Sequence, residues 1–296
     1  MEDQQLKLIH QYDTPLYPDV LFNRPIAGLS RFHIALFGGG KRGIAVLSEL
    51  YTSTLSMGIG PTCVVETQAV EPQLLPVGSL SMHADRKTKQ IVESADILSF
   101  IDRSNLAILA PEADLGSSLQ ILFEKILAQT NTPVIITDEM VGLYRFLPKG
   151  EQRPNVLFVL STDGLTKLAN ILALPVKIRP GRGVYNIISL VEAVHEATGA
   201  HVLSFDSDQA VIRDAMKSGE YGILHVPEGS IDQHRGLLIG LAAGLLAEAS
   251  QTLTSVLPKL MTVGYLFNAI LKESNGLHDP AMLERSLKDT LARELE

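Results

Sequence analysis

A run of glycines between an expected strand and an expected helix constrains the fold of this chain most. The apolar run 32–37 is typical of a buried strand, and 44–57 has the pattern of a helix. Glycine lets backbone N–H groups approach a phosphate closely, and the positive end of a helix dipole favours an anion at the same place. We therefore predict an anion site formed by the residues between them: Gly39, Gly40, Lys41, Arg42 and Gly43.

Strands and helices alternate along the rest of the chain. Further strands are expected at 62–66, 106–110, 133–137, 155–160, 201–205, 209–213 and 222–226. Further helices are expected at 85–95, 117–129, 163–172, 184–198, 236–249, 252–273 and 280–294. Such alternation predicts an α/β fold with a mostly parallel sheet between two layers of helices. The strands at 201–205 and 209–213 are predicted to form an antiparallel hairpin at its edge.

The chain has no internal linker or low-complexity segment after its first residues. Residues 1–30 contain Pro15, Pro18 and Pro25 and are predicted to form an irregular N-terminal arm that packs on the body or on a neighbouring subunit. We expect one α/β domain over 31–275 and a helical tail over 276–296.

Composition excludes several classes of protein. The net charge of −8 disfavours binding to nucleic acid, whose phosphates require concentrated Lys and Arg. The single cysteine excludes intramolecular disulfides, and the eight histidines show no metal-ligand spacing. No apolar stretch reaches the roughly 20 residues that span a bilayer, and no secretory signal is visible. We expect a cytoplasmic protein that binds neither membranes nor nucleic acid.

A second predicted anion site lies at the start of an apolar helix. This helix carries Gly236, Gly240 and Gly244 at four-residue spacing. Glycine costs about 1 kcal/mol relative to alanine inside a helix, so close backbone packing must offset that cost. The helix N-terminus presents unpaired N–H groups to an anion. We expect His234, Arg235 and Gly236 to line this site.

The order of these motifs resembles the ADP/ATP-dependent NAD(P)H-hydrate dehydratases, the YjeF C-terminal type within the ribokinase-like superfamily. The resemblance covers about 32–273 and lies in order and spacing more than in invariant residues. It predicts a ribokinase-like three-layer α/β/α fold. The matching segments follow one another as in that family: Gly39–Gly43, Gly58–Gly60, Asn105–Pro111, Pro133–Glu139 and Gly240–Glu248.

The resemblance implies nucleotide ligands. In that family ADP or ATP phosphorylates the hydroxyl of hydrated NADH or NADPH, and loss of phosphate restores the dinucleotide. The resemblance therefore implies ADP or ATP, Mg²⁺ and NAD(P)H or its hydrate as ligands, and assembly into a homo-oligomer. It also implies a lyase, or a small-molecule kinase, if the chain is an enzyme.

The chain departs from the family where the reaction takes place. Counting back from Gly244 without gaps puts Gly236 in place of the catalytic aspartate. Gln233, His234 and Arg235 then stand in place of the family's Gly-Thr/Ser-Gly. Asp232 is the candidate that could act as the base in a remodelled loop. Thr162–Leu165 likewise replaces the family's His-Pro-Gly-Glu. These changes indicate a divergent member whose standard catalytic motif is lost and whose activity is degenerate or altered.

Two alternatives remain open at this level. Gly38, Gly40 and Gly43 fit the dinucleotide fingerprint G-x-G-x-x-G, with Glu66 at the end of the next strand as the ribose ligand. That reading predicts a Rossmann-type NAD(P)-dependent oxidoreductase with a crossover at strand 32–37. The other alternative is a non-catalytic oligomer subunit that associates through helices 252–273 and 280–294.

Overall fold

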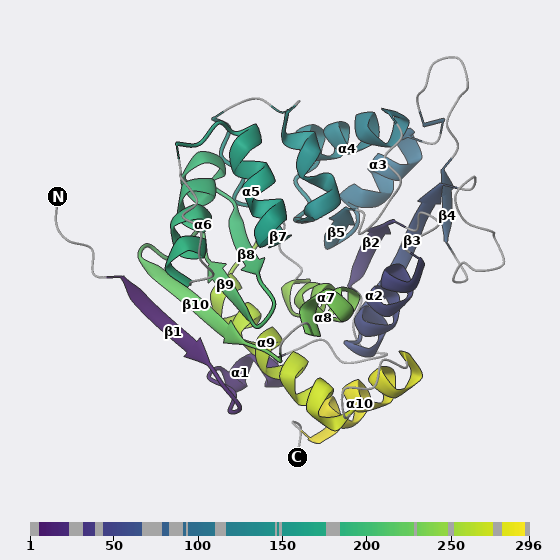
Figure 1. Ribbon diagram of the computed structural model, residues 1–296. Helices are drawn as coiled ribbons and strands as arrows, with labels where there is room; N and C mark the ends of the chain where they lie inside the picture. The colour runs from purple at the N-terminus through teal and green to yellow at the C-terminus, as the bar shows by residue number, and fades with distance from the viewer. Residues whose placement is uncertain are drawn as a thin grey trace.

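A single ten-stranded sheet is the framework of the described chain, in the order β1-β10-β9-β8-β7-β6-β5-β2-β3-β4 (Figure 1). The computed structural model describes residues 6–23, 32–38, 44–66, 79–82, 91–92, 94–109, 117–145, 147, 150–175, 184–227, 230–247, 252–274 and 280–293. The strands are β1 (Lys7–Gln11), β2 (His33–Phe37), β3 (Gly60–Glu66), β4 (Leu80–Met82), β5 (Leu106–Leu109), β6 (Val134–Thr137), β7 (Val156–Ser161), β8 (His201–Phe205), β9 (Gln209–Arg213) and β10 (Glu220–His225).

The sheet is parallel except at one strand. Every neighbouring pair is parallel apart from β8–β9 and β9–β10, so β9 alone runs against the others. This confirms the mostly parallel sheet and its antiparallel hairpin toward one edge. β10 and β1 lie beyond the hairpin, and Figure 1 shows β1 on the outer side of β10.

Helices cover both faces of the sheet, which gives the expected three layers. Alternate residues of β2 belong to opposite cores: Ile34 and Leu36 to one, Ala35 and Phe37 to the other. The first core is covered by α1 (Pro18–Phe22), α2 (Ile44–Ser56), α7 (Ser230–Gln233), α8 (Arg235–Leu246), α9 (Val256–Glu273) and α10 (Pro280–Arg293). The second is covered by α3 (Ser94–Asp102), α4 (Ser117–Gln129), the 3₁₀ helix η2 (Asp138–Arg145), α5 (Thr162–Ile171) and α6 (Val184–Thr198).

The structure differs from the sequence-based assignment in three regions. Residues 7–11 and 18–22 are not irregular, because β1 completes the sheet beside β10 and α1 packs on the first core. Residues 91–92 are not helical; α3 begins at Ser94, with Asp96 in its first turn, where an acid favours a helix start. α9 begins at Val256 rather than at 252, since Ser255 adopts a left-handed conformation with φ 51°.

The contact between α2 and α8 is made through the glycine stripe. A Cβ atom at Gly240 would lie 2.5 Å from Cβ of Ser53, and one at Gly244 would lie 2.6 Å from Cβ of Met57. Real Cβ atoms do not approach other atoms so closely, so the two helix backbones pack at a distance that only glycine allows. Every residue of α8 after Arg235 is buried.

We predict that Gly240→Ala lowers the free energy of unfolding by about 1–3 kcal/mol, because the added methyl group overpacks the α2 interface. Helix propensity alone would give the opposite sign. Urea denaturation of both proteins measures the difference.

Gly142→Ala is the matched control, since nothing lies within 4 Å of a Cβ at that glycine. It should change stability by less than about 0.5 kcal/mol, as an unobstructed surface substitution does. Equal losses in the two variants would contradict the packing role of the stripe.

Asp214 joins the β9–β10 turn to the start of α9. Its Oδ1 accepts a hydrogen bond from the N–H of Met216 at 2.9 Å, and its Oδ2 accepts one from the N–H of Leu257 at 3.0 Å. Nδ1 of His201 lies 3.2 Å from Oδ1. Burial would raise the pKa of this carboxyl, but these hydrogen bonds outweigh it and lower the pKa to about 2. Asp214 thereby supplies the helix cap that Ser255 does not.

We predict that Asp214→Asn destabilises the protein at neutral pH by about 2 kcal/mol, the value of a pKa shift of this size. Because the folded pKa lies below the ordinary 3.8, this stability is present above pH 3.8 and is lost as the pH falls toward 2. Urea denaturation from neutral pH downward should therefore show the wild type approaching the variant. Asp289→Asn, at an exposed carboxyl, is the control and should show no such convergence. A difference independent of pH would refute the charge argument.

Candidate functional site

A polar cluster gathers where β6, β7 and β8 end and α8 begins. Asp138 and Glu139 directly follow β6, Ser161 ends β7, and Phe205 ends β8. Arg235 is the first residue of α8. Parallel strands bring their carboxyl ends to one edge of a sheet, and ligands of open α/β folds bind at that edge.

Asp138 is fixed in place by the start of α5. Its Oδ1 accepts a hydrogen bond from the N–H of Ser161 at 2.9 Å. A Cβ atom at Gly164 would lie 1.9 Å from the same oxygen, so glycine at that position makes room for the carboxylate. Burial raises the pKa of Asp138, while Ser161 and the charge of Arg235 act against the rise. The carboxyl therefore protonates more readily than one in water.

Arg235 lies between two carboxylates and an aromatic ring. Its Nη1 is 3.2 Å from Oε1 of Glu139 and 3.8 Å from Oδ2 of Asp138. The guanidinium carbon lies 5.7 Å from the centre of the Phe205 ring, within the range of a cation–π contact. Nε of Arg235 is buried and has no hydrogen-bond partner among the described residues. The Thr137 hydroxyl donates to Oε2 of Glu139 at 2.9 Å and holds that carboxylate beside Arg235.

The other sequence-predicted residues at α8 lie in different directions. Nδ1 of buried His234 is 3.1 Å from Oε1 of Glu49 on α2. A Cβ atom at Gly236 would lie 2.6 Å from the carbonyl oxygen of Val46, also on α2. Asp232 is exposed on α7. The structure thus brings Arg235 alone of these four toward the strand ends.

The glycine run of the first predicted anion site lies outside the described residues. Gly39, Gly40, Lys41, Arg42 and Gly43 all fall there, so their part in a site stays a prediction. Gly38, which directly follows β2, is described and buried.

Sequence reasoning did not include Asp138 and Glu139 among the site residues. The signal that could have found them is their position, since two carboxylates come directly after the buried strand 133–137. Their partner Arg235 is 96 residues further along the chain, and no local pattern joins the two segments.

The described residues contain neither a cluster of metal ligands nor a helix that could span a membrane. Within them no group of three or more His, Cys, Asp or Glu side chains is arranged to hold a metal ion. No described helix combines the length and apolar character that crossing a bilayer requires.

Solved structures with the same architecture cover almost the whole chain. A ribokinase-like superfamily protein from Enterococcus faecalis aligns with a TM-score of 0.69 and 14% identity, covering 97% of this chain and 96% of its own. The chain has a ribokinase-like fold. No protein-family model and no curated protein matches it.

Two further structures with this ribokinase-like fold were crystallised with nucleotides. An ADP/ATP-dependent NAD(P)H-hydrate dehydratase from Bacillus subtilis, co-crystallised with ATP and Mg²⁺ and soaked with CoA, aligns with a TM-score of 0.59 and 14% identity, covering 96% of this chain and 98% of its own. A ribokinase from Cryptococcus neoformans in complex with ADP aligns with a TM-score of 0.57 and 10% identity, covering 88% and 99%.

The strand order contains the crossover that we expected only of the Rossmann alternative. β2 lies between β3 and β5, so the chain turns from one side of the sheet to the other at this strand. This ribokinase-like chain has the same crossover, which therefore does not separate the two readings. Gly38 lies at this switch point. The Glu66 side chain, which a Rossmann site would need, is outside the described residues.

We predict that Arg235→Gln destabilises the protein by about 1–3 kcal/mol near neutral pH, because Asp138 and Glu139 lose their partner at a largely buried position. The cost should shrink as the pH is lowered, since the carboxyl of Asp138 has a raised pKa and protonates first. Urea denaturation of the wild type and the variant, at neutral pH and at a lower pH, measures this cost.

Arg293→Gln is the matched control, because Arg293 pairs with Glu273 at an exposed position. It should cost less than about 1 kcal/mol, as exposed ion pairs do. An equal cost of Arg235→Gln at neutral pH and at the lower pH would contradict a charge interaction between Arg235 and the two carboxylates.

Proposed function

We propose that this chain is a divergent, NAD(P)H-hydrate dehydratase-like protein that binds the phosphates of ADP or ATP beside Arg235. We further propose that the standard aspartate-dependent chemistry of that family is lost. The observation that carries the proposal is Arg235 itself, a cation at the first turn of α8 that faces the carboxyl ends of three strands.

The surroundings of Arg235 suit a phosphate. The Nε–H group is a buried donor without a partner among the described residues, and a phosphate oxygen would accept its hydrogen bond. The first N–H groups of α8 have no acceptor within the helix and strengthen the attraction for an anion. Similar folds crystallised with ATP and Mg²⁺ or with ADP support a nucleotide as the source of that phosphate.

The two carboxylates beside Arg235 fit Mg²⁺. This ion takes oxygen ligands and is commonly held by one or two carboxylates together with substrate phosphates. Asp138 and Glu139 would hold it here, and the ion would neutralise charge on the phosphates. Arg235 would orient the same phosphates from the α8 side, and the Ser161 N–H would keep the Asp138 carboxylate in position.

The packing of α8 supports the loss of the family's aspartate. Position 236, where that residue would stand, faces α2 so closely that a Cβ would meet the Val46 carbonyl oxygen at 2.6 Å. An aspartate there could not point toward the strand ends without moving α2. Asp232 lies on the preceding helix, exposed, and is the candidate that remains for a base.

A Rossmann-type oxidoreductase is the second candidate, because Gly38, the first glycine of the predicted dinucleotide fingerprint, directly follows β2. The crossover at β2 is common to both candidates. The oxidoreductase candidate predicts tight NAD binding that Glu66→Gln abolishes and Arg235→Gln leaves intact. The nucleotide proposal predicts the reverse dependence. The third alternative, a non-catalytic oligomer subunit, predicts that the protein binds neither NAD nor ADP or ATP.

The test is thermal-shift titration with ADP, ATP, NAD, NADH and NADPH, each with and without Mg²⁺. We expect ADP or ATP to raise the melting temperature in a saturable way, by an amount that follows from mass action. Arg235→Gln should weaken this binding by about tenfold or more, the loss of one charge-assisted contact. Arg293→Gln should leave it unchanged.

A catalytic assay separates lost from altered chemistry. Hydrated NADH is incubated with the protein and ADP or ATP, and recovery of NADH absorbance is followed. We expect no recovery. Recovery that disappears in Asp232→Ala would overturn the loss of aspartate chemistry and assign the base to that residue. No thermal shift with any nucleotide would overturn the binding proposal itself.

A further inference from the structure

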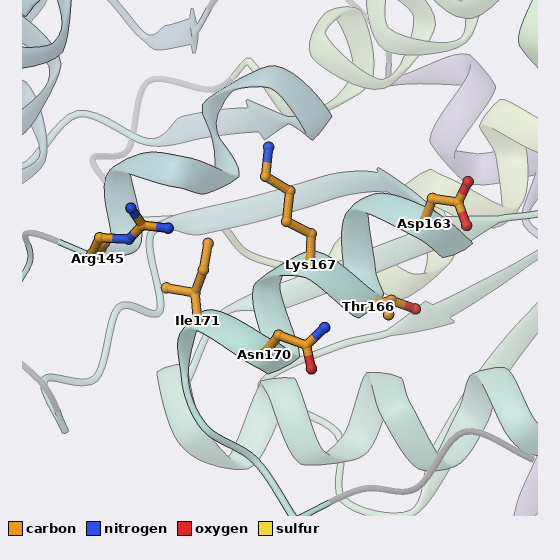
Figure 2. Close-up of a pocket in the computed structure, with 6 residues that line it drawn as sticks. All are labelled: Arg145, Asp163, Thr166, Lys167, Asn170 and Ile171. Carbon is orange, nitrogen blue, oxygen red and sulfur yellow. The ribbon is translucent and has the colours of Figure 1, made fainter.

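A groove of about 520 Å³ runs along the outer face of α5, apart from Arg235. Its lining comes from the end of η2 and from successive turns of α5: Arg145, Asp163, Thr166, Lys167, Asn170 and Ile171. Figure 2 shows Arg145 and Lys167 extending into the same hollow, with Asp163 at the opposite end of the helix. None of these side chains takes part in the Arg235 cluster.

The two cations of the groove differ from most described arginines and lysines of this chain. Arg153, Arg213 and Arg235 each have a carboxylate partner, at 2.6 Å, 2.6 Å and 3.2 Å. No ion pair or hydrogen bond joins Arg145 or Lys167 to another described residue, and both side chains are exposed. In a protein with a net charge of −8, two such cations in one hollow form a local site for an anion.

Acceptors line the rest of the groove, with Asp163 and Thr166 nearer the start of α5 and Asn170 nearer its end. Asp163 presents an exposed carboxylate. The Thr166 hydroxyl donates its proton to the carbonyl oxygen of Thr162 at 2.8 Å, so its oxygen faces the groove as an acceptor. Asn170 offers an amide that both donates and accepts. Residues 163 and 170 are about 10 Å apart along the helix axis at 1.5 Å per residue, the length of a small phosphorylated molecule.

We propose that this groove binds a phosphorylated sugar, either free or as the sugar–phosphate of a mononucleotide. Arg145 and Lys167 take the phosphate, since both donate to it and carry the opposite charge. Asp163 and Thr166 accept hydrogen bonds from the sugar hydroxyls and repel a second phosphate from that end. The ligand therefore lies in one direction along α5.

Isothermal titration calorimetry of the full chain tests the site with ribose 5-phosphate, AMP and inorganic phosphate. We expect saturable binding of ribose 5-phosphate or AMP that weakens as salt is added. The double variant Arg145→Gln/Lys167→Gln should weaken all three probes by about tenfold or more, equivalent to at least about 1.4 kcal/mol. Asp163→Asn should weaken the binding of ribose 5-phosphate relative to that of inorganic phosphate. The substitution removes a carboxylate acceptor for the sugar hydroxyls, whereas the loss of its negative charge favours the phosphate of both probes.

The matched control is Arg103→Gln/Lys217→Gln, which removes one arginine and one lysine from exposed positions elsewhere. It should leave the affinities unchanged. A loss confined to Arg145→Gln/Lys167→Gln places the binding in the groove rather than beside Arg235. The lining cations are exposed, so the groove variants should keep the wild-type melting temperature. Absence of saturable binding would overturn the proposal. So would equal weakening by the control, or an unchanged preference for ribose 5-phosphate over phosphate in Asp163→Asn.

Discussion

The close approach of α2 and α8 is the constraint on which the candidate site depends. Gly240 and Gly244 let the α8 backbone lie against Ser53 and Met57, at a distance that any side chain would prevent. These contacts fix the rotation of α8 about its own axis and its distance from α2. The same contacts set the position of the first turn of α8, so the directions of its side chains follow from the packing of the whole helix.

That rotation divides the start of α8 between two environments. His234 pairs with Glu49, and Gly236 touches the Val46 carbonyl oxygen, so both face α2. Arg235, between them in sequence, points the other way and meets Glu139. Arg235 and Gly236 are about 100° apart around the helix axis, which gives them different faces. His234 precedes the helix with non-helical backbone angles, so its direction is not set by the helical repeat. The dense packing against α2 thus excludes an acid at 236 and presents a cation at 235.

The sequence predicts the secondary structure and the layers of this protein better than its long-range contacts. Apolar runs such as 133–137 and the glycine spacing of α8 are local signals, and they predicted the layers and the tight helix contact. β1 was missed because its partner β10 is far along the chain and its own pattern is half polar. Asp138 and Arg235 were not connected because their contact is made only when the sheet is complete. Local periodicity records which residues are buried, but not which distant residue each will meet.

The pairing of β1 with β10 has a consequence for how the molecule forms. Lys7 on β1 bonds Glu220 on β10 across 213 positions of sequence. Residues 7–11 leave the ribosome long before their neighbour β10 exists, and domains generally fold as units. Until β10 has been synthesised, the segment 7–11 has no sheet edge to join. The β1–β10 pairing therefore forms only after residue 225 has been synthesised, and it closes a very long loop. The nascent chain carries an unpaired strand throughout most of its synthesis.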